Sequence, residues 1–346
     1  MTATNHGTES ALLVRTAGQL LEEGREHELA GRSSEAMECY AAAVDLTSTG
    51  AEPRVRAESL RRLGVLHHMR AEPEAASDLC RGSREAALES GAPDLAAEAS
   101  NALGGFALER GELEEAWVLY HAALQLADGN PVLIGKVTQN LGIIANIRGE
   151  WEEALSYYGR ALEAYRSVSD RRGVAQVHHN LGMIYAKQKR WQDADRQYRS
   201  CQGIAEAAGD RHLGGLAALN RAEVRLAIDD LEGARAGAEL ALRVFNEIES
   251  RRDKAGAHRM LGMVFRRRGQ MALAESHLRS AVEIAAGAQC PLTEADAAKE
   301  LALLYKAQRR TEESLRLFQR ARTIYQKLEA LADLAELEAL TGGNHA

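Results

Sequence analysis

Residues 176–202 read QVHHNLGMIYAKQKRWQDADRQYRSCQ, and the spacing of their apolar side chains decides the fold. Val177, Leu181 and Ile184 recur at intervals of three and four residues, and a second series with helical spacing runs from Trp191 to Cys201. Such intervals place side chains on one face of an α-helix. The segment therefore predicts a hairpin of two helices joined by the basic turn KQKR.

A small residue returns every 40 positions along the chain, with one interval of 38. This position holds Gly24, Gly64, Gly104, Gly142, Gly182, Ala222, Gly262 and Ala302. Twelve residues later stand Ala36, Ala76, Ala116, Ala154, Ala194, Ala234, Ala274 and Ser314. Seven residues further on stand Ala43, Ser83, Ala123, Ala161, Cys201, Ala241, Ala281 and Ala321. A fixed period of this kind is typical of a solenoid, whose units bury their apolar faces by stacking on one another.

The period predicts how the chain is organised. It runs without interruption over residues 17–328, so we expect one elongated array rather than separate domains. Residues 1–16 are mostly polar and are predicted to be a frayed N-terminal segment. Residues 329–346 are predicted to form a capping helix and a tail, because Leu331–Leu340 reads as half of a further repeat.

The order of residue types within one repeat resembles a known family. Leu-Gly, an aromatic residue, a turn, Ala and a second aromatic residue follow one another in LGMIYAKQKRWQDADRQY (181–198), and LGIIANIRGEWEEALSYYGRAL (141–162) and LGGFALERGELEEAWVLYHAAL (103–124) share much of this order. This order resembles the tetratricopeptide repeat. The resemblance implies an all-α fold, a right-handed superhelical solenoid of about eight helical hairpins with a C-terminal capping helix. The period exceeds the family's usual length of about 34 residues, and it is similar to the long repeats of Pins/LGN adaptors, kinesin light chains and Rap-type peptide-sensing regulators.

Composition narrows the classes of function. The formal net charge of −7 offers no excess of positive charge for nucleic acid. No apolar run has the length of a membrane span, and residues 1–10 lack the features of a secretory signal, so we expect a cytoplasmic protein.

Asparagine recurs where we expect the inner surface of the array. The first helices should line this surface, with ligand-facing residues two, three and six positions before the repeated glycine and one or four after it. Asn140, Asn180 and Asn220 all stand two positions before that residue. A carboxamide can pair with both the N–H and C=O groups of an extended peptide, and the resemblance implies that use. The alternative is structural, with these side chains capping a loop or bridging adjacent first helices.

Other polar residues share the inner-face spacing and complete the predicted peptide-binding site. Around the asparagines they are Lys136, Gln139, Asn146, Gln176, His179, Met183 and Lys187. Further along the array they are Arg61, Arg62, Arg259 and Arg266. These cations could hold an acidic or C-terminally free peptide through charge-assisted hydrogen bonds. Because Glu58, Glu98, Glu223 and Asp296 are interleaved with them, a solvated and charge-balanced face is the alternative.

No pattern predicts catalysis, a cofactor or a metal. The segment Gly129–Lys136 lacks the spacing and the hydroxyl of a phosphate-binding loop. The adjacent histidines of the pairs His67-His68 and His178-His179 point about 100° apart on a helix and do not converge on one ion. We therefore expect a non-catalytic interaction module that binds a peptide or partner segment in the groove, as an adaptor or scaffold. The alternatives are a peptide-sensing regulator whose superhelix changes on binding, and a scaffold that self-associates through its terminal repeats.

Overall fold

The computed structural model describes residues 15–127 and 129–342, and the regular secondary structure of these ranges consists of α-helices. Most of the predicted frayed segment and the last four residues of the tail lie outside the described residues. The chain divides into two compact units, unit 1 up to Val168 and unit 2 from Ser169. No helix within the described residues is long and apolar enough to span a membrane.

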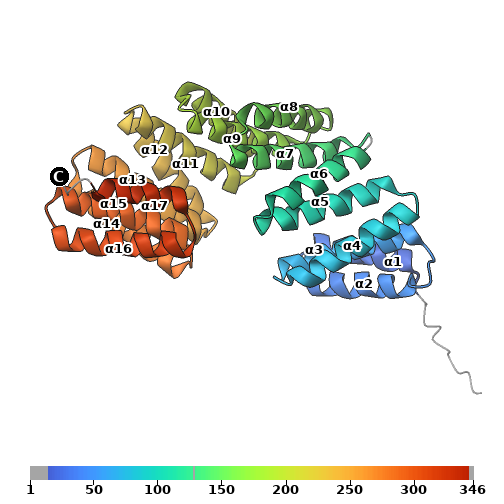
Figure 1. The fold of residues 1–346 in the computed structure, drawn as a ribbon. Helices are drawn as coiled ribbons and strands as arrows, with labels where there is room; N and C mark the ends of the chain where they lie inside the picture. The colour runs from blue at the N-terminus through green and yellow to red at the C-terminus, as the bar shows by residue number, and fades with distance from the viewer. Residues whose placement is uncertain (1–14, 128, 343–346) are drawn as a thin grey trace, which may run out of the picture. The chain divides into compact units, whose positions relative to one another are not determined.

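The helices follow one another at intervals close to 20 residues (Figure 1). Unit 1 contains α1 (Ala17–Leu29), α2 (Ser33–Leu46), α3 (Pro53–Met69), α4 (Pro73–Glu89), α5 (Pro93–Glu109), α6 (Leu113–Leu126), α7 (Pro131–Arg148) and α8 (Trp151–Ser167). Unit 2 contains α9 (Arg171–Lys187), α10 (Trp191–Ala207), α11 (Arg211–Ala227), α12 (Leu231–Glu247), α13 (Arg251–Arg267), α14 (Met271–Gly287), α15 (Pro291–Ala307), α16 (Thr311–Lys327) and α17 (Leu331–Gly342). The predicted all-α array of helical hairpins is confirmed.

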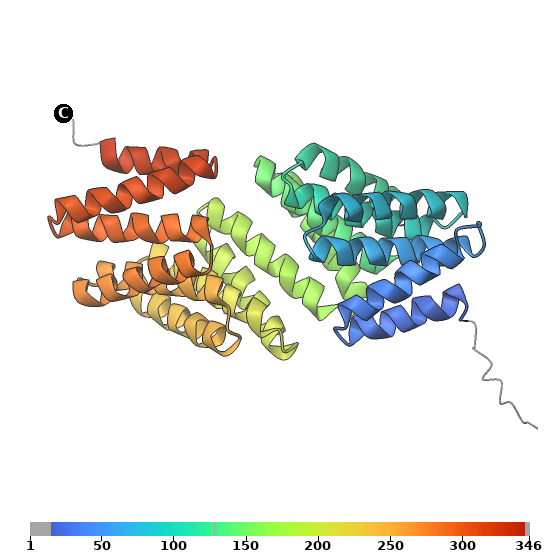
Figure 2. The ribbon, with the colours of Figure 1, turned by 90° about the horizontal axis from the view of Figure 1, so that it is seen from below.

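The odd-numbered helices form the inner layer of each unit. Each odd helix from α1 to α15 packs against the even helix that follows it, and the hairpins stack in chain order, as Figure 2 shows for unit 2. Odd helices also contact the next odd helix, α1 with α3 and α5 with α7 in unit 1, and α9 with α11 in unit 2. Even helices make no comparable contacts with one another in the described chain. The first helices therefore present a shared surface within each unit.

A residue in the left-handed conformation ends most helices. Within the hairpins these residues are Gly31, Ala71, Gly111, Gly149, Lys189, Asp229, Gly269 and Arg309. Around Lys189, with φ of 57°, the N–H of Arg190 donates to the carbonyl of Tyr185 over 2.8 Å, and Lys189 itself donates to Ala186. This arrangement satisfies the carbonyls left at the end of α9 and reverses the chain.

A glycine and an aromatic ring hold the two helices of a hairpin together. A Cβ atom on Gly182 would lie 2.5 Å from the ring of Tyr198, so the ring occupies the place of a side chain. The same pairing joins Gly24 with Tyr40, Gly104 with Tyr120, and Gly142 with Tyr158. Cys80 and Leu278 take the place of the ring opposite Gly64 and Gly262. The expected close approach of the second helix to the repeated glycine is thus present.

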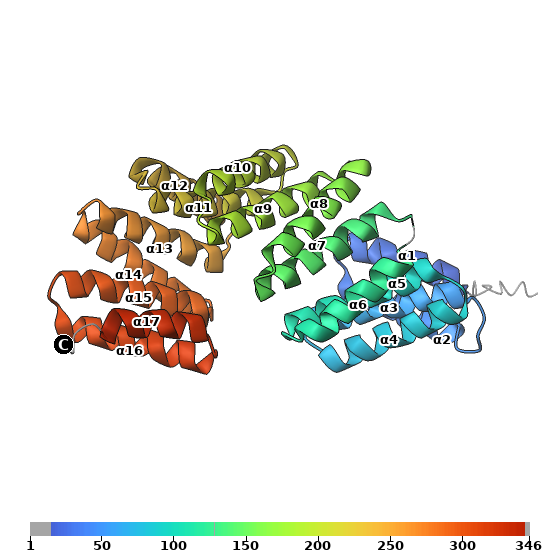
Figure 3. The ribbon, with the colours of Figure 1, turned by 45° about the horizontal axis from the view of Figure 1, so that its top comes forward.

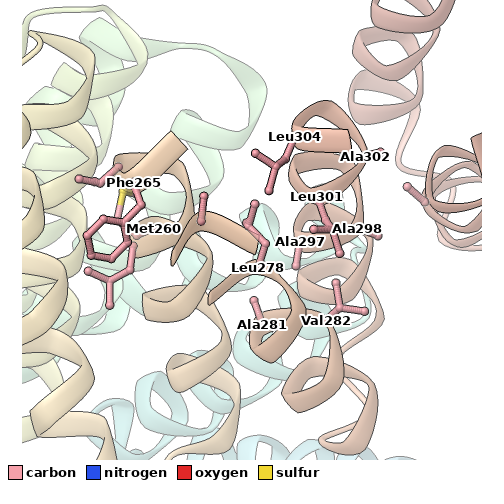
Figure 4. Packing of buried hydrophobic residues seen from close by; sticks show 14 of the residues in the cluster. Met260, Phe265, Leu278, Ala281, Val282, Ala297, Ala298, Leu301, Ala302 and Leu304 are labelled. Atoms are coloured by element: carbon pink, nitrogen blue, oxygen red, sulfur yellow. The ribbon is translucent and has the colours of Figure 1, made fainter. Parts of the chain in front are cut away.

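The core continues from hairpin to hairpin. In unit 2, Leu278 and Ala281 of α14 lie between Phe265 of α13 and Leu301 of α15, all of them buried (Figure 4). At the end of the chain, α17 packs on α16 and buries Leu337 completely. Each hairpin therefore covers the apolar face of the preceding one.

Substitution of Gly182 by alanine should destabilise the fold. The added Cβ would collide with the ring of Tyr198, and such overpacking costs about 1 to 3 kcal/mol. Gly203 on α10 of the same hairpin has open space at its Cβ, so Gly203→Ala should instead stabilise the fold by about 0.5 to 1 kcal/mol. Urea unfolding of both variants measures the two effects, and equal midpoints would disprove the packing role of Gly182.

Substitution of Lys189 by glycine should stabilise the fold. A side chain costs about 1 to 2 kcal/mol in the left-handed conformation, and the greater backbone entropy of glycine in the unfolded chain offsets part of the gain. We expect a net gain of about 0.5 to 1 kcal/mol in thermal or urea unfolding. The reciprocal variant Gly149→Ala, at the same turn of the preceding repeat with φ of 79°, should lose stability.

Candidate functional site

Unit 1 carries a pocket of about 500 Å³ between the inner helices α3, α5 and α7, called here the unit 1 pocket. Its lining includes Glu58, Arg61, Arg62, Val65, His68, Glu98, Asn101, Phe106, Lys136 and Asn140. On α3 these residues stand six, three and two positions before Gly64 and one and four positions after it. The inner-face spacing expected from the sequence therefore coincides with the lining of this pocket.

The arginines of the unit 1 pocket are already paired with carboxylates. Arg61 lies 2.7 Å from Glu98 of α5, and Arg62 lies 2.9 Å from Glu28 of α1 and 3.0 Å from Glu58. Burial raises the pKa of Glu58, but hydrogen bonds from Arg25 and Arg62 more than offset it and hold the pKa below its usual value. The positive charge that these arginines offer to a ligand is thus largely balanced.

Two other polar groups of the unit 1 pocket have no ionic or hydrogen-bond partner among the described residues. Lys136 of α7 is exposed and has no carboxylate partner among the described residues. The buried Oδ1 of Asn101 accepts no hydrogen bond there. Beside them the imidazole of His68 stacks on Phe106 with ring centroids 4.2 Å apart and contacts Glu109 at 2.9 Å. The pocket therefore offers an ammonium group and a carboxamide above an aromatic wall.

In unit 2, His179 bridges asparagines on neighbouring inner helices, α9 and α11, which Figure 3 shows side by side. Nδ2 of Asn220 lies 2.9 Å from Nε2 of His179, and Asn180 also bonds to this imidazole. Burial lowers the pKa of His179, and the bond with Asn180 opposes that shift. A neutral imidazole can accept the hydrogen bond that Asn220 donates. At Asn220 the structural alternative, a bridge between first helices, is thus present.

Asn220 also borders a pocket of about 350 Å³, called here the unit 2 pocket. Its lining is Met183, Ala186, Lys187, Trp191, Tyr198, Asn220, Glu223, Val224 and Ala227. Asn220 bonds to the hydroxyl of Tyr198 as well as to His179. Because a carboxamide has two N–H groups and an oxygen with two lone pairs, these partners leave part of its hydrogen-bonding capacity for a ligand.

The structure places the remaining predicted residues as follows. Gln139 accepts a hydrogen bond of 3.0 Å from the hydroxyl of Tyr165. Asn146 is buried, and Gln176 is half-buried on α9. Arg266 is paired with Glu300 of α15 at 2.6 Å, whereas Arg259 donates to the sulfur of Met263 over 3.9 Å.

The sequence interpretation missed several pocket residues. Asn101 stands three positions before Gly104, so the inner-face spacing could have identified it. The spacing of Trp191, Tyr198 and Val224 is that of core residues. Nothing in the sequence indicates that they also line a pocket. For this pocket the sequence offers one signal: Ala186 and Ala227 are small, so they leave space beside them.

Comparison with curated protein sequences found no match. Solved structures resemble the fold over most of the chain. The apo form of the quorum sensor NprR from B. thuringiensis matches with a TM-score of 0.71 and 17% identity, covering 89% of this chain and 87% of that one. A Signal Transduction ATPase with Numerous Domains from Pyrococcus horikoshii, with a tetratricopeptide repeat sensor, matches with a TM-score of 0.71 and 16% identity, covering 94% of this chain and 50% of that one. A Rap protein complexed with competence and sporulation factor matches with a TM-score of 0.61 and 12% identity, covering 93% and 96%.

Neutral His179 should make stability depend on pH. The folded chain lowers the pKa of His179, while the unfolded chain protonates it near the usual value of about 6.5. The free energy of unfolding should therefore fall as the pH drops below that value, and this contribution is complete above it. His179→Gln removes the titrating group, so its unfolding free energy should fall less between neutral and acidic pH. Urea unfolding at both pH values tests this, and equal losses in the two proteins would contradict it.

Two stretches of the sequence match family models directly. Residues 135–207 and 295–329 each match a model described as tetratricopeptide repeat. The first covers α8, α9 and α10 with most of α7, and the second covers α16 with most of α15. The close packing of the repeated glycine on the second helix recurs at the same period before and between these stretches. Both stretches are tetratricopeptide repeats, and with the recurring glycine contact they support the identification of the chain as a tetratricopeptide repeat protein.

Proposed function

We propose that this chain is a protein-interaction module that binds an extended segment of a partner on its inner helices. The observation that carries the proposal is the arrangement of Asn180, Asn220 and His179. His179 joins these carboxamides of adjacent repeats, and Asn220 lines the unit 2 pocket. Main-chain N–H and C=O groups of a peptide recur along its length, and carboxamides that recur along the array can pair with them.

Internal hydrogen bonds fit this proposal because they fix the amides before a ligand binds. His179 holds Asn220, and Tyr198 contacts the same side chain. A side chain that is already ordered loses less conformational entropy on binding. Each bond to a ligand would contribute on the order of 1 kcal/mol, so the asparagines would set direction and register more than affinity.

The predicted residues of unit 1 would form a binding surface of their own. Asn140 and Lys136 line the unit 1 pocket, where Lys136 could bind a carboxylate of the partner. Arg61, Arg62 and Arg266 would act mainly through their shape and their ion pairs, because carboxylates of the chain already neutralise them. Arg259, which has no carboxylate partner among the described residues, would be available to an acidic side chain.

A peptide-responsive regulator is the second candidate. The likeness to a quorum sensor and to a tetratricopeptide repeat sensor favours it, because both cover about nine tenths of this chain. On this proposal, binding would change the packing of the hairpins. Small-angle scattering of the full chain with and without a bound peptide distinguishes the candidates. An unchanged profile would favour the adaptor.

Selection of short random peptides displayed on phage against the immobilised full chain tests the proposed function. We expect enriched sequences whose synthetic peptides bind in a saturable way, at one peptide per chain, by titration calorimetry. Peptide binding that survives alanine substitution of Asn180 and Asn220 would place the interaction elsewhere on the molecule. A selection that enriches no binding peptide would contradict the proposed function itself.

The double variant Asn180→Ala, Asn220→Ala should bind a selected peptide about tenfold or more weakly, because it loses on the order of 1 to 2 kcal/mol of hydrogen bonding. The matched control is Asn246→Ala, an exposed asparagine at the end of α12. Its affinity should equal that of the wild type. Circular dichroism of both variants shows whether the fold is retained.

A further inference from the structure

The unit 2 pocket exists because two small residues meet between neighbouring inner helices. Ala186 stands four positions after Gly182 on α9, and Ala227 stands five positions after Ala222 on α11. Both line the pocket. A larger side chain at either position would extend into the space above Tyr198.

Other repeats do not combine small residues at these two positions. Four positions after the repeated small residue stand Glu28, His68, Leu108, Asn146, Leu226, Arg266 and Lys306. Five positions after it stand Leu29, Met69, Glu109, Ile147, Lys187, Arg267 and Ala307. Ala307 is the one further alanine, and the repeat before it carries Arg266. The two small residues therefore meet only between α9 and α11 among the compared repeats, and the space is open there.

The walls of the pocket are apolar and rigid. Tyr198 and Val224 are buried and pack with Ala194, and Trp191 contacts the same cluster. On α10 the ring of Tyr198 packs against Gly182, and this contact fixes one wall of the pocket.

The two charged residues that line the pocket have opposite charges. Lys187 and Glu223 both line it and carry opposite charges, so the pocket has no net charge to offer an ionised group. Met183, 37% exposed, adds an apolar and adaptable side chain. An uncharged apolar group matches this lining better than an acidic or basic one.

We propose that the unit 2 pocket receives one aromatic or large aliphatic side chain of the bound peptide, and that Ala186 and Ala227 make it the specificity pocket of the array. This inference rests on the proposed function. Asn220 lines the same pocket, so it can bond to the main chain next to the inserted side chain. A volume of about 350 Å³ accommodates a side chain of this size.

The test compares Ala227→Leu with the matched control Ala307→Leu. Ala307 holds the same position in the eighth repeat, is exposed, and lies outside the unit 2 pocket. Leucine, methionine and isoleucine occupy this position in other repeats, so both variants should fold, which thermal unfolding checks. Peptides selected on the wild-type chain serve as the probe, together with copies whose shared apolar residue is replaced by alanine.

We expect selected peptides to share one aromatic or large aliphatic residue. Ala227→Leu should bind them about tenfold or more weakly, whereas Ala307→Leu should bind them as the wild type does. The alanine copies should bind the wild type as weakly as the parent peptides bind Ala227→Leu, and Ala227→Leu should not weaken them further. This double comparison assigns the apolar residue to the pocket.

Four results would overturn the inference. Selected peptides without a shared apolar residue, or equal binding by the wild type and Ala227→Leu, would do so while leaving the proposed function intact. Equal losses in Ala227→Leu and Ala307→Leu would show that the effect does not come from this pocket. A selection that yields no binding peptide would remove the proposed function and this inference together.

Discussion

The contact between the repeated glycine and the side chain of the second helix is the constraint on which the architecture depends. In four repeats a tyrosine ring lies where the glycine would otherwise carry a side chain, so the helices approach to the distance that the ring allows. This close approach fixes the hairpin, and the odd helices of successive hairpins then contact one another within each unit. The inner surface and its pockets follow from that stacking.

The sixth repeat shows what the constraint requires. Ala222 replaces the glycine, and Ala238 replaces the aromatic residue, so a small side chain stands on each helix. Both are fully buried, and Gly237 beside them brings the helices close. In this repeat two small side chains and a glycine therefore meet where glycine and a ring meet in four of the others.

Sequence periodicity predicted the helices, their pairing and the glycine contact, because each depends on residues within one repeat. The hydrogen bond from Asn220 to His179 and the ion pair of Arg61 with Glu98 join residues 41 and 37 positions apart. Their partners are selected by how one hairpin sits on the next, which the period alone does not specify. The inner-face spacing identified Asn220 and Arg61 but not whether their polar groups were already used. Likewise, the period continues unchanged across Val168, so it does not indicate the division into two compact units there.

Ala186 and Ala227 occupy helix ends at which the other repeats tolerate charged, polar and apolar side chains alike. The contact between Gly182 and Tyr198, which holds the hairpin together, involves other positions. Exchange of the half-buried side chain at position 186 and the exposed one at position 227 could therefore close this pocket, and the same exchange between other hairpins could open a new one. The position of the side-chain pocket along the array could in this way change during evolution while the helical hairpins stay the same.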